Sequence, residues 1–88
     1  MITDFTKQFD KILEKITNVT LLEKIEEAIK SVENAVMKKD IPKLKKLKGY
    51  KIHYRIRVGR YRIGITIEND LVTFFTCLPR KEFYRRFP

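Results

Sequence analysis

The feature that most constrains the fold is a change in the spacing of apolar residues near Tyr50. Before it, apolar residues recur every three to four positions, which is the period of a helix with one buried face. After it, apolar and polar residues alternate, which is the period of a strand with one buried face. The chain therefore predicts an α+β fold with helices first and sheet second, and its 88 residues suit a single domain, 1–88.

The first half of the chain predicts a short strand followed by two helices. Residues 2–5 are expected to form an edge strand, and Thr6 is placed to cap the helix that follows. A turn at residues 18–19 leads to a second helix, with a capping box at Thr20, that runs to about Lys38. Because this turn is so short, the helices should pack as an antiparallel hairpin. Their apolar stripes are Phe9, Ile12, Leu13 and Ile16, and then Leu22, Ile25, Ala28, Ile29, Val32 and Val36.

The second half predicts a mostly antiparallel sheet of three to four strands. Residues 50–78 are expected to form a three-stranded meander, in which residues 71–78 are nearly all apolar, as in a central strand covered on both faces. Residues 43–49 are interpreted as a basic linker, and residues 81–87 as a short C-terminal helical turn. The helical hairpin should pack on one face of the sheet, with a row of cations on the other.

Positive charge is confined to the second half. The net charge is +9, but residues 1–40 hold seven basic and eight acidic side chains, whereas residues 41–88 hold thirteen basic and three acidic ones. Such a concentration costs self-repulsion, which a bound polyanion would relieve. A solvated basic surface kept for solubility is the alternative interpretation.

The predicted cationic face could bind phosphate. Arg55 and Arg57 lie two residues apart on one strand, so both project from the same face about 7 Å apart. Arg62 follows on that face after a turn. Guanidinium groups so arranged can hold phosphates bidentately, although strand cations can also simply protect a sheet edge. His53 shares the direction and is a candidate general acid or base, or an ordinary surface residue.

Tyr84 lies among the cations of residues 80–86. Neighbouring positive charges would favour its phenolate and lower its pKa, which suits a general base. The alternative is that Tyr84 packs in an apolar tail with Phe83 and Phe87.

Other classes of function are disfavoured by what the sequence lacks. One His, one Cys and no carboxylate pair near the basic residues predict no metal site, and the absence of a Gly-rich loop disfavours nucleotide triphosphate chemistry. Cys77 excludes an internal disulfide and is expected to be a small buried hydrophobe. No apolar run approaches the roughly 20 residues of a membrane span, and no secretory signal is visible, so a cytoplasmic location is expected.

Taken together, the basic residues form a pattern that resembles the RelE/ParE superfamily of toxins from bacterial type II toxin–antitoxin systems. The pattern is R-x-R-x-G-x-Y-R at residues 55–62 followed by R-K-x-x-Y at residues 80–84. Leu47-Lys48-Gly49 and the opening residues 5–11 are also similar to the family. The resemblance covers nearly the whole chain and implies a strand, a helical hairpin and an antiparallel sheet.

Toxins of the RelE branch enter the ribosomal A site and cut mRNA by attack of a ribose 2′-hydroxyl on the adjacent phosphate, without a metal. The resemblance implies that Arg62 stabilises the phosphorane, that Arg80 assists the leaving group, and that Tyr84 acts as base or stacking platform. Where many members carry a His, this chain has Pro79. A near-neutral acid is therefore missing unless His53 supplies it. The candidate RNA-binding residues are Arg55, Arg57, Lys48, Lys51 and Lys81.

Two alternatives remain open. The ParE branch shares the fold but poisons DNA gyrase, and a basic RNA-binding module would not catalyse at all. The expected partners are a cognate antitoxin with acidic residues facing the basic sheet, the ribosome and mRNA, with no small-molecule cofactor and no membrane.

Overall fold

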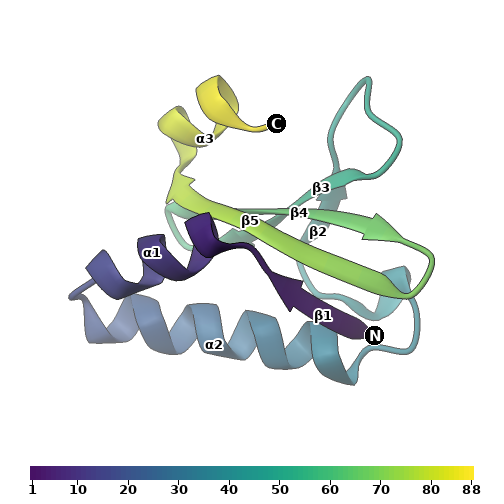
Figure 1. Ribbon diagram of the computed structural model, residues 1–88, viewed down its shortest axis with the longest axis horizontal. Coiled ribbons are helices and arrows are strands. Elements are labelled where there is room, and N and C mark those ends of the chain that lie inside the picture. Colours follow the sequence, from purple (N-terminus) through teal and green to yellow (C-terminus); the bar gives the residue numbers. More distant parts are fainter.

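A five-stranded sheet lies at the centre of the computed structural model, which describes residues 1–88. The elements follow the chain as β1 (Ile2–Phe5), α1 (Lys7–Lys15), α2 (Val19–Asn34), a 3₁₀ turn (Lys38–Asp40), β2 (Leu44–Lys46), β3 (His53–Val58), β4 (Tyr61–Glu68), β5 (Leu71–Pro79) and α3 (Arg80–Arg86). The strand order is β1-β5-β4-β3-β2. Figure 1 shows α1 and α2 on one side of the sheet and α3 on the other.

The α+β prediction is confirmed, with five strands rather than three to four. β3, β4 and β5 form the expected antiparallel meander, and β1 pairs in parallel with β5. The extra strand is β2, within the segment interpreted as a linker, where Leu44 pairs with Ile56 and Lys46 with Tyr54. Three residues are too few to reveal a period, and lysines are typical of a sheet edge.

Both long helices begin at side-chain caps. The Thr6 hydroxyl accepts a hydrogen bond from the Phe9 backbone N–H at 3.1 Å, which confirms the predicted cap. The capping box at Thr20 is wrong, because the Asn18 side chain caps α2 by accepting from the Leu21 N–H at 3.0 Å. Asparagine is at least as strong a cap as threonine and comes two residues earlier, so the helix begins there.

α2 ends at Asn34, before the expected Lys38. The amino group of Met1 donates to three carbonyl oxygens at this end of the helix. These carbonyls would otherwise need backbone N–H groups from a further helical turn. α2 is the longest helix with 16 residues, and no helix is both long and apolar enough to cross a membrane.

The predicted alternation along β3 and β4 is confirmed by their two faces. One face packs on the helices, and Phe9, Ile25 and Val32 are fully buried against it. The fourteen core residues are Phe9, Ile25, Val32, Ala35, Ile41, Tyr54, Ile56, Val58, Ile63, Ile65, Ile67, Val72, Phe74 and Cys77. The opposite face of the sheet, called the open face below, carries His53, Arg55 and Arg57 from β3 and Arg62, Gly64 and Thr66 from β4.

α3 covers part of the open face, so the exposed row of cations is narrower than the sequence predicts. Phe83 is fully buried, and the Phe87 ring lies 5.3 Å from the Phe83 ring. Gly64 makes room for this contact, because a Cβ there would lie 2.9 Å from Cγ of Phe87 and from Cγ2 of Thr76. A register shift beside Gly64 leaves Phe75 of β5 without a partner on β4.

Candidate phosphate-binding site

The β3–β4 hairpin brings two arginines directly opposite each other. Arg57 pairs with Arg62, and Arg55 pairs with Gly64. Opposed residues of an antiparallel pair lie about 5 Å apart at Cα, and like charges in this position destabilise a sheet. A bound anion would remove this repulsion, so the hairpin has the character of an anion site.

Arg62 is the most constrained of these side chains. It is 9% exposed, and its Nη1 donates to the carbonyls of Gly59 at 3.0 Å and of Tyr61 at 2.9 Å. Its Nε is buried without a hydrogen-bond partner. An unpaired buried donor costs about 1–3 kcal/mol, and more when charged, so the fold holds this guanidinium in place at an energetic cost. An oxyanion that reached it after a shift of the side chain would form charge-assisted hydrogen bonds.

Arg55 is held in a similar way, and Arg57 is not. Arg55 is half-buried, its Nη1 donates to the Lys43 carbonyl at 3.0 Å, and its Nε is also buried and unpaired. The Arg57 side chain is exposed. The open face thus combines two oriented guanidinium groups with one that is free to adjust.

α3 adds further predicted residues to this end of the sheet. The Arg80 N–H donates to the Arg60 carbonyl at 3.0 Å, which holds the start of α3 beside the β3–β4 turn. Arg80 and Tyr84 are four residues apart and so share one side of the helix, and both side chains are exposed, unlike the buried Phe83. Tyr84 is 52% exposed and contacts Phe83 edge-on at 5.1 Å, so it is not packed within the apolar tail. Lys81 is exposed next to Arg80.

The structure does not bring His53 to the arginines of the turn. It lies four residues before Arg57 on β3, a separation of about 13 Å along a strand. Its ring contacts Tyr50 at 5.2 Å and Phe87 at 5.6 Å. Lys48 and Lys51 are exposed on the loop that precedes β3, at the same end as His53. The predicted residues therefore form two groups at opposite ends of β3.

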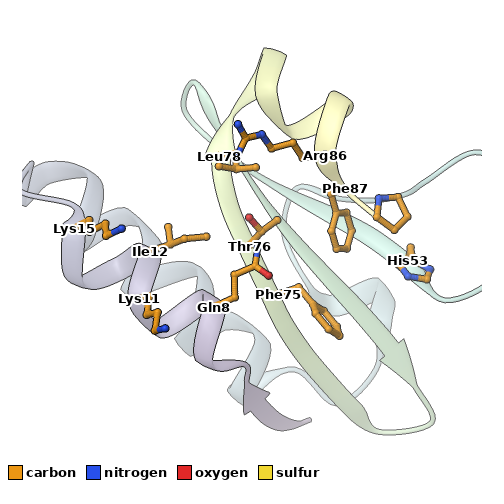
Figure 2. Close-up of a pocket in the computed structure, with 11 residues that line it drawn as sticks. Gln8, Lys11, Ile12, Lys15, His53, Phe75, Thr76, Leu78, Arg86 and Phe87 are labelled. Carbon is orange, nitrogen blue, oxygen red and sulfur yellow. The ribbon is translucent and has the colours of Figure 1, made fainter.

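A groove of about 710 Å³ lies between α1 and the end of α3 (Figure 2). It was not predicted. Lys11 and Lys15 line it from α1 and Arg86 lines it from α3. Their sequence signal is weak: the two lysines share a helix face at i, i+4, but nothing in the sequence indicates what that face meets. The lining consists of Gln8, Lys11, Ile12, Lys15, His53, Phe75, Thr76, Leu78, Arg86, Phe87 and Pro88.

Cys77 is a core residue, as predicted. It is 2% exposed, and burial raises the pKa of its thiol to about 12, so it stays protonated. No three or more His, Cys, Asp or Glu side chains are grouped so that they could hold a metal ion.

Comparison with known proteins identifies the family. The family described as the ParE toxin of the type II toxin–antitoxin system parDE matches residues 3–84. The chain belongs to the RelE/ParE toxin family. Toxin RelE3 of Methanocaldococcus jannaschii is 39% identical over 85 residues, which are 96% of both chains. The protein is therefore a homologue of RelE toxins from type II toxin–antitoxin systems.

Solved structures agree with this family. A chain in the crystal structure of a RelB–RelE antitoxin–toxin complex from Methanococcus jannaschii is 38% identical, with a TM-score of 0.77 over 97% of this chain and 99% of that one. A RelE–RelB complex from Pyrococcus horikoshii has a TM-score of 0.72 at 20% identity, covering 90% and 93% of the chains. The second likeness concerns the fold alone.

Proposed function

We propose that this protein is the toxin of a type II toxin–antitoxin pair and acts as a metal-independent, ribosome-dependent mRNA endoribonuclease. The observation that carries the proposal is the Arg62 guanidinium, which is buried, oriented by two carbonyls and left with an unpaired Nε–H. Arg57 directly opposite supplies a second, exposed guanidinium. Donors fixed in advance are what a reaction that builds negative charge on phosphorus requires.

In the proposed reaction, a ribose 2′-oxygen attacks the adjacent phosphorus as it loses its proton, and the bond to the 5′-oxygen of the next nucleotide breaks. Arg62 and Arg57 donate to the phosphoryl oxygens, whose charge grows in the transition state. The 2′-proton passes to the Tyr84 oxygen, or to a water molecule where Tyr84 instead stacks on a base. Arg80 stabilises the departing 5′-oxygen electrostatically, because arginine does not give up its proton. A water molecule then protonates that oxygen, as Pro79 supplies no acid.

The remaining predicted residues are proposed to bind the RNA on either side of this centre. Arg55 and Lys81 flank the β3–β4 turn. His53, Lys48 and Lys51 lie at the other end of β3 and would contact a different part of the RNA. His53 could act as a general acid only for an RNA group bound at its own end of β3.

The proposed partners are the ribosome with its mRNA, and an antitoxin. Solved structures similar in fold include complexes described as RelB–RelE from Methanococcus jannaschii and RelE–RelB from Pyrococcus horikoshii, which supports a cognate antitoxin here. Acidic side chains of that antitoxin would pair with the cations of the open face. Because these partners are cytoplasmic, we propose that the protein acts there.

The test is cleavage of a defined mRNA on ribosomes, with 5′ ends mapped. Arg62→Ala is expected to lower the cleavage rate by about 10²–10³, as loss of a fixed oxyanion donor does in other enzymes. Arg57→Ala, whose side chain is exposed, should also lower the rate without disturbing the fold. Arg60→Ala is the matched control, since it removes an exposed arginine from the same turn. Equal rates for folded Arg62→Ala and Arg60→Ala proteins would contradict the assignment.

Inhibition of DNA gyrase is the second candidate, because the matching family description is that of a ParE toxin. Intact mRNA together with accumulating gyrase–DNA cleavage complexes would favour it. RNA binding without either effect would favour a non-catalytic module.

A further inference from the structure

We propose that the groove between α1 and α3 is a binding site for one unpaired nucleotide of the RNA, separate from the arginine centre. This inference rests on the proposed action on RNA. Leu78 lines the groove and lies opposite Arg62 in the β4–β5 ladder, so the groove adjoins the site of the scissile phosphate. The nucleotide would thus be one that flanks the cleaved bond.

The charges around the groove are all of one sign. Lys11 and Lys15 stand one turn apart on α1, and Arg86 faces them from α3. No acidic residue lines the groove. In Figure 2 the lysines project from α1 and the Arg86 side chain extends from α3 over β5, so cations reach the groove from two elements. This arrangement suits a ligand whose phosphates flank an uncharged centre.

The floor of the groove is apolar and partly aromatic. Phe75 and Phe87 line it, with their ring centres 6.3 Å apart, and Ile12 and Leu78 complete its apolar surface. Phe87 is held in place by Phe83, so its ring is a fixed surface. A nucleobase stacks on such a ring whatever its identity, and loss of one stacking contact typically weakens binding about 10-fold or more.

Thr76 supplies an independent observation. It is 2% exposed, lines the groove, and its hydroxyl oxygen has no hydrogen-bond partner. Figure 2 shows it between α1 and α3, and Gln8 lines the same groove. Buried hydroxyl groups are normally paired, so a base edge that displaces the exposed Gln8 side chain would satisfy it. An acidic peptide matches the charged sides, but it leaves the aromatic floor without a planar partner.

The experiment measures binding of the full-length protein to a labelled RNA hexamer without ribosomes, where the proposed cleavage does not occur. The Lys11→Ala/Lys15→Ala double variant should weaken binding at least 10-fold and reduce the slope of log K against log salt by about 1.4, at roughly 0.7 per lost phosphate contact. Lys7→Ala/Lys30→Ala removes the same charge from exposed sites outside the groove and should change affinity less than 3-fold. Thr76→Val should weaken binding while preserving shape.

Two further probes identify the occupant. A hexamer with the same phosphates but no bases should bind wild type about 10-fold more weakly than the intact hexamer. Equal affinities for the two hexamers would overturn the nucleotide site. The site would also be overturned if the wild type bound polyglutamate and the Lys11→Ala/Lys15→Ala variant lost that binding as strongly as RNA binding, because the groove would then be a surface for an acidic peptide. Wild type that binds RNA through the groove but does not cut it would contradict the proposed function alone. If the wild type cuts mRNA but the Lys11→Ala/Lys15→Ala and Lys7→Ala/Lys30→Ala variants bind RNA with equal affinity, only the nucleotide site in the groove would be contradicted.

Discussion

At the residue scale, Gly64 decides whether the C-terminal segment can lie on the sheet. Replacing it with alanine would put a methyl group 2.9 Å from the Phe87 ring and from Thr76 Cγ2. Gly64→Ala is therefore expected to destabilise the fold by about 1–3 kcal/mol, which is the usual cost of overpacking. Denaturant unfolding measures this cost. Because much of the clash is with the Phe87 ring, adding Phe87→Ala should cost less than the sum of the two single changes. Additive effects would contradict the contact.

Individual residues also mark the limit of the sequence-based interpretation. The two-residue period placed Arg55, Arg57 and Arg62 on one face, because alternation alone fixes the faces of a strand. It did not indicate that Phe87 covers Gly64 on that same face, since this contact depends on the path of α3. Nor did it indicate that Arg62 bonds back to its own turn.

At the scale of elements, the start of α2 tests which residue caps it. Asn18→Ala is expected to cost about 1 kcal/mol of stability, because the Leu21 N–H would lose its acceptor. Thr20→Ala is the matched control and should be nearly neutral, since Thr20 lies inside the exposed first turn. Urea unfolding of both variants gives the comparison. A larger loss for Thr20→Ala would restore the capping box that the sequence suggested.

Elements with a clear period were predicted well, and those defined only by their partners were not. The spacing of apolar residues shows which face of α1, β3 and β4 is buried, and β5 is marked by its nearly continuous apolar run. β2 has three residues, and only its pairing with β3 makes it a strand. The groove is likewise formed by two elements far apart in sequence. The sequence therefore does not mark Lys11 and Lys15 as candidate binding residues, because this role depends on α3 lying across the groove from them.

At the scale of the whole molecule, the charge asymmetry along the chain becomes an asymmetry in space. The nearly neutral residues 1–40 form β1 and the two helices that cover the core face (Figure 1). The thirteen basic side chains of residues 41–88 belong to the rest of the sheet, its loops and α3. The folded state therefore bears the repulsion among these like charges.

The unfolding temperature should therefore depend on the kind of anion present. Sodium chloride screens the repulsion and should raise stability modestly. If the folded protein binds single-stranded RNA as proposed, RNA at 100 times its dissociation constant should add about 2.7 kcal/mol. Calorimetry with RNA and with sodium chloride at equal ionic strength separates the two effects. The stabilisation by RNA beyond that by sodium chloride should be smaller in the Arg57→Ala protein and unchanged in the Lys7→Ala/Lys30→Ala protein. If RNA stabilised no more than chloride, the basic side would be a solvated surface, and both the catalytic proposal and the groove would lose their physical basis.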